Sequence, residues 1–157
     1  MRKNFGAKPF LYPQPVMVIA SCDKDGTPDA MNAAWGGIAG GDKIFLCLSS
    51  NHKTVENILE RKAFTVSVAD EAHLVEADYV GLVSGNDVPD KLERSGFHVT
   101  RSEFVDAPVI DELGVQAGQL RPGLPLYAGP DRERRGGRSN PGRGGDDRPG
   151  QAEAHYL

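Results

Sequence analysis

The sequence predicts a mainly β domain with inserted helices. Three observations support this fold class: short apolar runs rich in β-branched residues, tight turns between those runs, and segments with helical spacing that are all short. A chain of 157 residues normally forms one domain. This combination favours a β-barrel with inserted helices over a doubly wound parallel sheet.

The first third of the chain is predicted to form three strands. Val16–Cys22 is apolar and β-branched, and Asp23–Gly26 reads as a hairpin turn in which the glycine takes a positive φ. Asp29–Gly36 is then expected to pair back as one second strand. After another turn at 40–42, Lys43–Leu48 is expected to form the third.

A helix is expected to start near Lys53. Its apolar positions have a spacing near 3.6, and they are Thr54, Val55, Ile58 and Leu59. Ser50 or Asn51 precedes the helix and is a suitable N-cap.

The rest of the body alternates short elements. Ala63–Val68 is predicted to be a strand, and Leu74–Val83 a helix. The apolar side of that helix is expected to comprise Val75, Tyr79 and Leu82. Pro89–Ser95 reads as a short helix closed by Gly96, and Phe97–Val109 as irregular or extended chain.

Charge is distributed unevenly along the chain. Residues 1–113 hold 11 Lys and Arg against 17 Asp and Glu, whereas 114–157 hold seven against five. An acidic body argues against nucleic acid as the main partner, although an Arg/Gly-rich tail could touch RNA or DNA electrostatically.

Two cysteines, Cys22 and Cys47, are too few and too far apart for a zinc site or a CxxC motif, so no metal is expected. We expect both to be small buried residues without a disulfide. The sequence shows no signal peptide, and its longest apolar run is far below a membrane span. A cytoplasmic protein with no membrane partner is therefore expected.

Three stretches carry candidate chemistry. Residues 30–37 combine small side chains with Asn32 and Trp35, which suits a flat heterocycle, although taken alone they fit better a crowded sheet centre with a core tryptophan. Residues 48–57 bring hydroxyls, His52 and Lys53 to a helix start, which suits a phosphate as well as an ordinary capped helix. Residues 78–91 end in a Ser-Gly-Asn loop that could cover a ligand but is also ordinary turn chemistry.

Together these stretches closely resemble the flavoredoxin-like branch of the flavin reductase-like family. The matching strings are NFGAKP from Asn4, AMNAAWGG from Ala30, LSSNHKTVENI from Leu48, YVGLVSGNDVPDK from Tyr79 and GFHVTRSEFVDAPVIDE from Gly96. The resemblance is almost continuous from Met1 to Leu113. It implies an FMN-binding split β-barrel of Greek-key topology that forms homodimers, with FMN near the subunit interface.

The resemblance also implies site residues. By this carry-over Asn32, Ala33, Ala34 and Trp35 line the isoalloxazine ring, whereas Ser49, Ser50, His52, Lys53 and Thr54 hold the ribityl chain and phosphate, with Ser84 and Gly85 nearby. The flavin would carry the redox chemistry, so no catalytic side chain is assigned. His73 and His98 are taken as structural or surface residues.

The resemblance implies an FMN-dependent oxidoreductase that takes electrons from NADH, NADPH or a partner redox protein. A flavin-binding electron carrier without turnover is the first alternative. A non-functional product of a damaged reading frame is the second.

The tail, residues 114–157, departs from the family. It holds ten of the 19 glycines and five of the 11 prolines, and it lacks Phe, Trp, Ile and Met. Such a segment is expected to be disordered, with at most a short piece near Leu120–Tyr127 along the barrel edge. Shifting the reading frame by one base near Leu113 recovers segments resembling the missing strands in the right order. We therefore interpret the tail as a frameshift product that leaves the barrel incomplete at its C-terminal end; a genuine Arg/Gly tail is the alternative.

Overall fold

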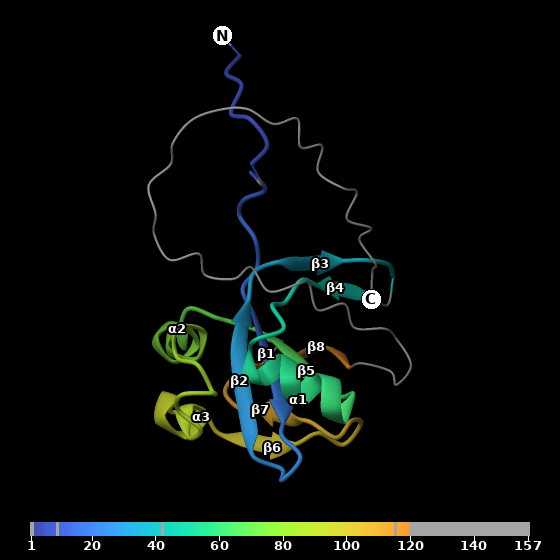
Figure 1. The fold of residues 1–157 in the computed structure, drawn as a ribbon, viewed down its shortest axis with the longest axis vertical. Helices are drawn as coiled ribbons and strands as arrows, with labels where there is room; N and C mark the ends of the chain where they lie inside the picture. Colours follow the sequence, from blue (N-terminus) through green and yellow to red (C-terminus); the bar gives the residue numbers. More distant parts are fainter. Residues whose placement is uncertain (1, 9, 42, 115, 120–157) are drawn as a thin grey trace, which may run out of the picture.

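The computed structural model describes residues 2–8, 10–41, 43–114 and 116–119. They form a mainly β domain with three helices, as the sequence predicts (Figure 1). The strands are β1 Met17–Cys22, β2 Pro28–Ala33, β3 Gly36–Ile38, β4 Ile44–Leu46, β5 Thr65–Val68, β6 Val99–Arg101, β7 Pro108–Ile110 and β8 Gln116–Gln119. The helices are α1 Lys53–Arg61, α2 Leu74–Leu82 and α3 Lys91–Ser95.

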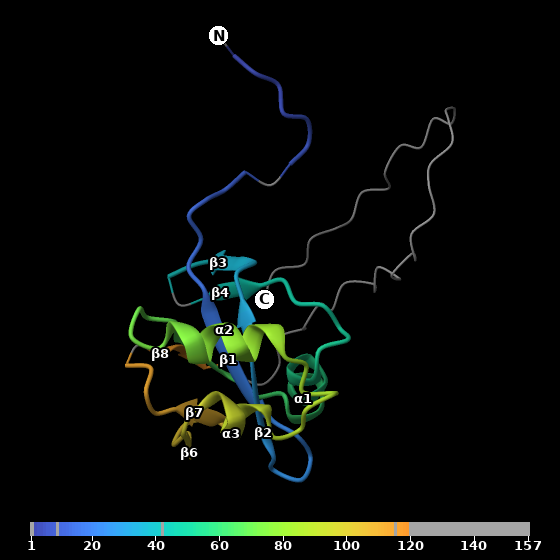
Figure 2. The same cartoon turned by 90° about the vertical axis from the view of Figure 1, so that its left-hand side faces the viewer.

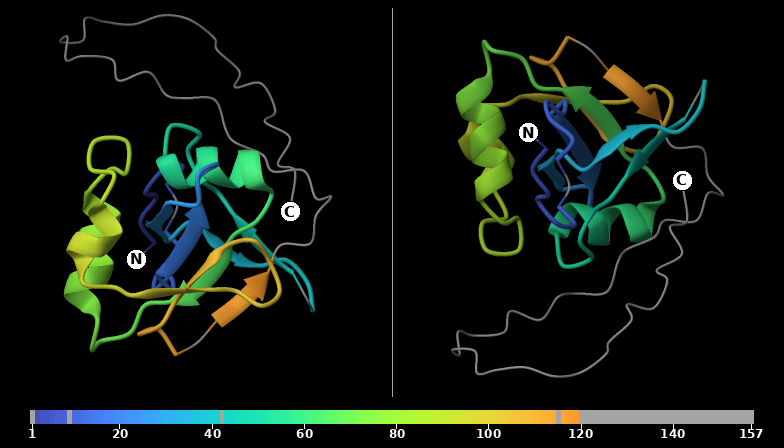
Figure 3. Two further views of the ribbon diagram at one scale, coloured as in Figure 1. Left: turned by 90° about the horizontal axis from the view of Figure 1, so that it is seen from below. Right: turned by 90° about the horizontal axis from the view of Figure 1, so that it is seen from above.

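The main sheet has the strand order β2-β1-β5-β8, with antiparallel neighbours. In β1, Met17 lies opposite Ala33 of β2 and Val68 of β5. The pairs β3-β4 and β6-β7 form separate two-stranded sheets. Seen along the vertical axis, helix α1 lies on one side of β1 and β2, and α2 and α3 lie on the other (Figure 3).

Both faces of β1 are buried, and alternate residues pack into two different clusters. Val18 and Ala20 pack with residues of α2, α3 and β7, whereas Met17 and Ile19 pack with residues of α1 and β5. This period of two is the side-chain alternation of a strand, and burial on both faces explains why Met17–Ala20 is a continuous apolar run. The main sheet thus anchors helices on both sides, and their ends meet beside β2.

The second strand is shorter than predicted, because the single strand expected over Asp29–Gly36 is wrong. The chain leaves β2 after Ala33 and enters β3 at Gly36, in a different sheet. A Cβ on Gly36 would lie 2.6 Å from the carbonyl oxygen of Phe45. The absence of a side chain therefore permits the close β3-β4 pairing, and the break directs Ala34 and Trp35 outward.

The buried face of α2 also differs from the prediction. Ala77 and Val80 are the buried residues, whereas Val75 and Leu82 are exposed and Tyr79 is only partly buried. Alanine at the contact position lets the helix approach the sheet closely, a geometric effect that apolar spacing does not encode.

Smaller expectations have mixed outcomes. Gly26 and Gly96 both have φ of +89°, so the predicted hairpin turn and helix end are confirmed. Neither Ser50 nor Asn51 caps α1, because the N-cap is His52, whose carbonyl accepts hydrogen bonds from the amides of Val55 and Glu56. The stretch predicted as irregular or extended, Phe97–Val109, contains the β6-β7 hairpin.

The cysteines are both free thiols, but the expectation that they are buried is wrong. Cys22 is half-buried and Cys47 is exposed. Cys47 follows β4 rather than lying within it, which accounts for its exposure. In the described part of the chain, no helix is long and apolar enough to cross a membrane.

Strand β8 lies within the tail that was expected to lack regular structure. Its backbone pairs with β5, with Thr65 opposite Gln119 and Ser67 opposite Gln116. The expectation is therefore wrong for these four residues. The remainder of that prediction, including the piece near Leu120–Tyr127 and the incomplete barrel end, lies outside the described residues.

Candidate functional site

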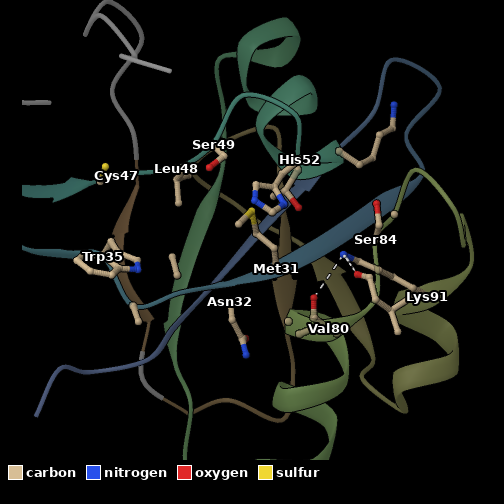
Figure 4. A pocket seen from close by; sticks show the side chains of 17 residues that line it. Met31, Asn32, Trp35, Cys47, Leu48, Ser49, His52, Val80, Ser84 and Lys91 are labelled. Carbon is tan, nitrogen blue, oxygen red and sulfur yellow. Dashed lines mark hydrogen bonds between the residues drawn. The ribbon is translucent and has the colours of Figure 1, made fainter. Parts of the chain in front are cut away.

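A pocket of about 260 Å³ lies beside β2, where the segment leading into α1 meets the segment that follows α2 (Figure 4). Ten of the eleven residues assigned from the family resemblance line it: Asn32, Ala33, Ala34, Trp35, Ser49, His52, Lys53, Thr54, Ser84 and Gly85. Ser50 is partly buried and does not line the pocket. Three separate stretches of sequence thus converge on one cavity.

Asn32 lines this cavity and carries a buried, unpaired acceptor. Its Nδ2 donates a hydrogen bond to the carbonyl oxygen of Ala77 at 2.7 Å, which ties β2 to α2. Its Oδ1 is buried and has no hydrogen-bond partner among the described residues. Because burying an unpaired acceptor costs about 1–3 kcal/mol, the position favours a ligand that brings an N–H donor.

Two glycines pack closely against β2 beside the pocket. A Cβ on Gly81 would lie 2.5 Å from Asn32 Nδ2, and a Cβ on Gly85 would lie 2.5 Å from Asp29 Oδ1. Their missing side chains therefore allow the 80–85 segment to approach β2 closely.

Trp35 lies at one end of the pocket, close to Cys47, whereas Ser84 and Lys91 lie toward the other end (Figure 4). The Trp35 side chain is 59% exposed, so the interpretation of a core tryptophan is wrong. A flat apolar ring that is open to solvent at the mouth of a pocket offers a surface for an aromatic ligand.

The start of α1 lies at the pocket and carries positive charge. Lys53 lines the cavity, and its Nζ lies 3.4 Å from Glu56 Oε1. The first amides of a helix have no acceptor within the helix and carry positive potential. Lys53, His52 and these amides can therefore hold an anion.

The Thr54 hydroxyl is already engaged. Thr54 is 1% exposed, and its Oγ1 donates a hydrogen bond to Asp29 Oδ2. Its main-chain carbonyl accepts a hydrogen bond from Ser21 Oγ at 3.1 Å. Among the Thr54 groups, only the backbone amide remains suited to an anion.

The Ser84 loop is fastened to the segment before α1. Asn86 Nδ2 donates to the carbonyl oxygen of Asn51 at 3.0 Å, and the Asn86 amide donates to Ser84 Oγ at 3.2 Å. The loop thereby stands beside the anion end of the pocket, and Ser84 and Gly85 line it.

The remaining lining residues were missed by sequence reasoning: Met31, Cys47, Leu48, Val80, Gly81, Val83 and Lys91. Six of the seven, all except Cys47, lie within the candidate stretches 30–37, 48–57 and 78–91, so membership of these stretches was an available signal. Lys91 closes the third of these stretches and the matching string from Tyr79, but it was assigned no role.

The two histidines set aside lie outside this pocket. His73 Nδ1 lies 2.8 Å from Asp70 Oδ1, and His98 Nδ1 lies 2.6 Å from Glu112 Oε1. A second cavity of about 390 Å³ borders Cys22, Arg61 and Asp106 and contains none of the assigned residues. Within the described ranges, no group of three or more His, Cys, Asp or Glu could hold a metal ion.

The described residues thus form a mainly β domain in which a helix start and a glycine-containing loop border a pocket. Residues 10–117 match the model of the flavin reductase like domain. The chain belongs to the flavin reductase-like family, and the predicted split-barrel fold is confirmed.

Solved structures of similar proteins agree. Flavoredoxin of Desulfovibrio vulgaris (Miyazaki F) superposes with a TM-score of 0.67 at 37% identity, over 71% of this chain and 62% of that one. Flavoredoxin from Methanosarcina acetivorans superposes with a TM-score of 0.62 at 27% identity, over 72% of this chain and 60% of that one. An FMN-binding domain of a flavin reductases-like enzyme from Shewanella baltica OS155 superposes with a TM-score of 0.60 at 24% identity, over 64% of this chain and 53% of that one. At this identity the likeness supports a shared fold only.

The chain therefore spans about three fifths of the length of these flavoredoxins. No match to a curated protein was found. The family is an FMN-binding one that includes flavoredoxins and flavin reductases.

Proposed function

We propose that this chain binds FMN in the pocket beside β2 and acts as an FMN-dependent oxidoreductase. The observation that carries the proposal is that ten residues assigned from three separate sequence stretches line one cavity. Trp35 at one end and Lys53 near the α1 start offer a surface for a ring and a cation for a phosphate. This polarity fits a ligand that is a heterocycle at one end and an anion at the other.

The donor chemistry of the pocket suits FMN. The unpaired Asn32 Oδ1 can accept a hydrogen bond from an N–H group on the ring edge. Ser49, His52, Lys53 and the first amides of α1 would bind the phosphate, whereas the Ser84-Gly85 loop would border the ribityl chain. When bound, FMN supplies the redox chemistry, and the residues of this chain bind it, orient it and shield it from water.

Electron input is proposed to come from NADH, NADPH or a partner redox protein. The test is spectroscopic titration with FMN, followed by steady-state NADH and NADPH oxidation with FMN bound. The proposal predicts saturable FMN binding at one site per chain and nicotinamide oxidation above that of free FMN. Absence of saturable binding would contradict it.

The alternative is an electron-carrying module that binds FMN but does not turn over a nicotinamide. The likeness to flavoredoxins at 37% and 27% identity favours keeping this alternative. FMN binding together with no nicotinamide oxidation, but with reduction by a protein electron donor, would select it.

A homodimer with FMN near the interface is part of the proposal. The pocket of about 260 Å³ falls below the range of about 300–1,000 Å³ typical of small-molecule sites, so FMN would extend beyond it. Exposed apolar side chains occur at Trp35 in the pocket lining, at Ile38 in β3 and at Leu82 at the end of α2, with exposures of 59%, 84% and 77%. Such side chains commonly mark an interaction surface. Light scattering with and without FMN should report a mass of two chains; a monomer in both conditions would contradict this part.

A frameshift near Leu113 remains the proposed origin of the tail. The shift would lie in the gene or in its sequencing, and a shift in the gene itself would favour the alternative of a truncated, non-functional product over the oxidoreductase. Sequencing the gene around the Leu113 codon and weighing the intact protein decide it. If the sequenced gene and the measured mass both give the Arg/Gly-rich tail, an error in the sequence is excluded as the origin of the frameshift.

A further inference from the structure

Three buried polar side chains meet at the anion end of the pocket: Asp29 of β2, and Thr54 of α1 and Lys91 of α3, which also line it. They are 5%, 1% and 3% exposed, respectively. Charged residues are almost never buried unless they are paired. The trio therefore calls for an explanation, and Lys91 is not among the residues assigned from the family resemblance.

The contacts of the trio are fully defined. Lys91 Nζ lies 3.1 Å from Asp29 Oδ1, and Thr54 Oγ1 donates a hydrogen bond to Asp29 Oδ2. Lys91 Nζ also donates to the carbonyl oxygens of Val83 at 3.1 Å and Val80 at 3.5 Å, the contacts drawn as dashed lines in Figure 4. The three ammonium hydrogens thus have three acceptors, and none is left for a ligand.

The pair joins the elements that form the pocket. Asp29 belongs to β2, Thr54 to the first turn of α1, and the two carbonyls to the C-terminal end of α2. Figure 2 labels these three elements in one view. Each of these elements also contributes lining residues. The ion pair therefore sets how the α1 start stands relative to the 80–85 segment.

The pair also lies close to the cation at the pocket. A Cβ on Gly85 would lie 2.5 Å from Asp29 Oδ1 and 3.1 Å from Lys53 Cβ. The buried carboxylate is thus separated from the Lys53 stem by a glycine backbone alone. In a poorly solvated site, an uncompensated carboxylate at this place would repel a phosphate over this distance.

We propose that Lys91 is a positioning residue that neutralises Asp29, so that the buried carboxylate does not weaken the preference of the pocket for a phosphate monoester over its neutral counterpart. The inference rests on the proposed function. Lys91 acts through Asp29 and the α2 carbonyls and does not touch the phosphate. Asp29 accepts the Thr54 hydrogen bond and so holds the start of α1. Lys91 balances the negative charge of Asp29, which would otherwise repel the phosphate.

The test compares FMN with riboflavin, which differ by the phosphate, in the full chain. Dissociation constants are measured by quenching of flavin fluorescence for wild type, Lys91→Met, Asp29→Asn and the double variant. Lys91→Met leaves an unpaired carboxylate and should weaken FMN about tenfold more than riboflavin. Asp29→Asn leaves the Lys91 ammonium without its carboxylate and should increase the affinity for FMN relative to riboflavin. The double variant should return the FMN-to-riboflavin ratio to that of wild type.

The matched control is Arg94→Met on the same helix. Arg94 pairs with Asp90 at 2.8 Å on the exposed side of α3, so its removal changes the net charge equally without reaching the pocket. It should leave the ratio unchanged. If Lys91→Met does not fold, as judged by circular dichroism, the sign of the Asp29→Asn shift decides alone.

A purely structural pair gives a different result. Equal changes in FMN and riboflavin affinity for both single variants, or an Asp29→Asn ratio equal to that of wild type, would overturn the inference. If wild type prefers FMN and Lys53→Ala removes that preference, such a result leaves the proposed function standing. If wild type binds neither flavin, both proposals are wrong.

Discussion

Asn32 and Ala77 are joined by a hydrogen bond of 2.7 Å from the side-chain Nδ2 to the main-chain carbonyl, and this bond orients the unpaired Asn32 Oδ1. The amide cannot turn without losing the Ala77 contact. A side chain that is held in this way is pre-organised to accept one hydrogen bond from a ligand.

Asn32→Ala should weaken FMN and riboflavin equally, because the lost acceptor serves the ring that both ligands share. A hydrogen bond of about 0.5–1.5 kcal/mol corresponds to roughly a two- to twelve-fold loss for each ligand. Fluorescence titration of both flavins measures it. A loss confined to FMN would place Asn32 at the phosphate and contradict the assignment.

Gly81→Ala should displace Asn32, because the new Cβ would lie 2.5 Å from Nδ2. We expect about 1–3 kcal/mol of destabilisation, together with weaker binding of both flavins. The control is Gly41→Ala, where a Cβ meets nothing within 4 Å. Urea unfolding measures the stabilities; equal unfolding midpoints for the two variants would show that Asn32 is not held as described.

Cys47 should react with a thiol reagent faster than Cys22. Cys47 is exposed and lines the pocket. Burial raises the pKa of the Cys22 thiol, an effect that Arg61 opposes only in part, so less reactive thiolate is present at neutral pH. Saturating FMN should slow modification of Cys47 and leave Cys22 unchanged, with Cys47→Ser separating the two rates. Equal protection of both thiols would indicate a global effect of FMN rather than a local one.

Glu112 should contribute to the loss of folding stability at acid pH. Burial raises its pKa, but hydrogen bonds from the His98 side chain and amide outweigh this and hold the pKa below its ordinary value of 4.5. A carboxyl group whose pKa is lower in the folded state than in the unfolded state stabilises the fold at pH values above its unfolded-state pKa. This stabilisation is lost as the pH falls through its folded-state pKa. Glu112→Gln should therefore flatten the fall in the free energy of unfolding below pH 4.5. Glu103→Gln, at an exposed position, is the control and should leave that slope unchanged.

The local elements were predictable where short-range pattern decides them. The apolar run at β1, the glycine turn at Gly26 and the helix from Lys53 follow from alternation, positive φ and 3.6 spacing. The buried face of α2 was predicted wrongly, because tertiary contacts determine it: α2 buries Ala77 and Val80 rather than its larger apolar residues. Burial of the small alanine depends on how closely the helix meets β2.

In the candidate site too, features encoded by local motifs were predictable and contacts between distant residues were not. The motif strings located ten lining residues, because each lies within a continuous matching stretch. They did not reveal the role of Lys91 or the engagement of the Thr54 hydroxyl with Asp29, since both depend on residues more than 20 positions apart. Pairing across elements has no local sequence signature.

The most direct test of FMN binding is the effect of Lys53→Ala on FMN and riboflavin affinity. Loss of a charge-assisted contact of roughly 1.5–3 kcal/mol should weaken FMN by about ten- to 150-fold and leave riboflavin nearly unchanged. Lys24→Ala, at an exposed position in the β1-β2 turn, is the equal-charge control and should change neither. Selective loss of FMN affinity supports a phosphate at the start of α1; equal weakening of both ligands would contradict it.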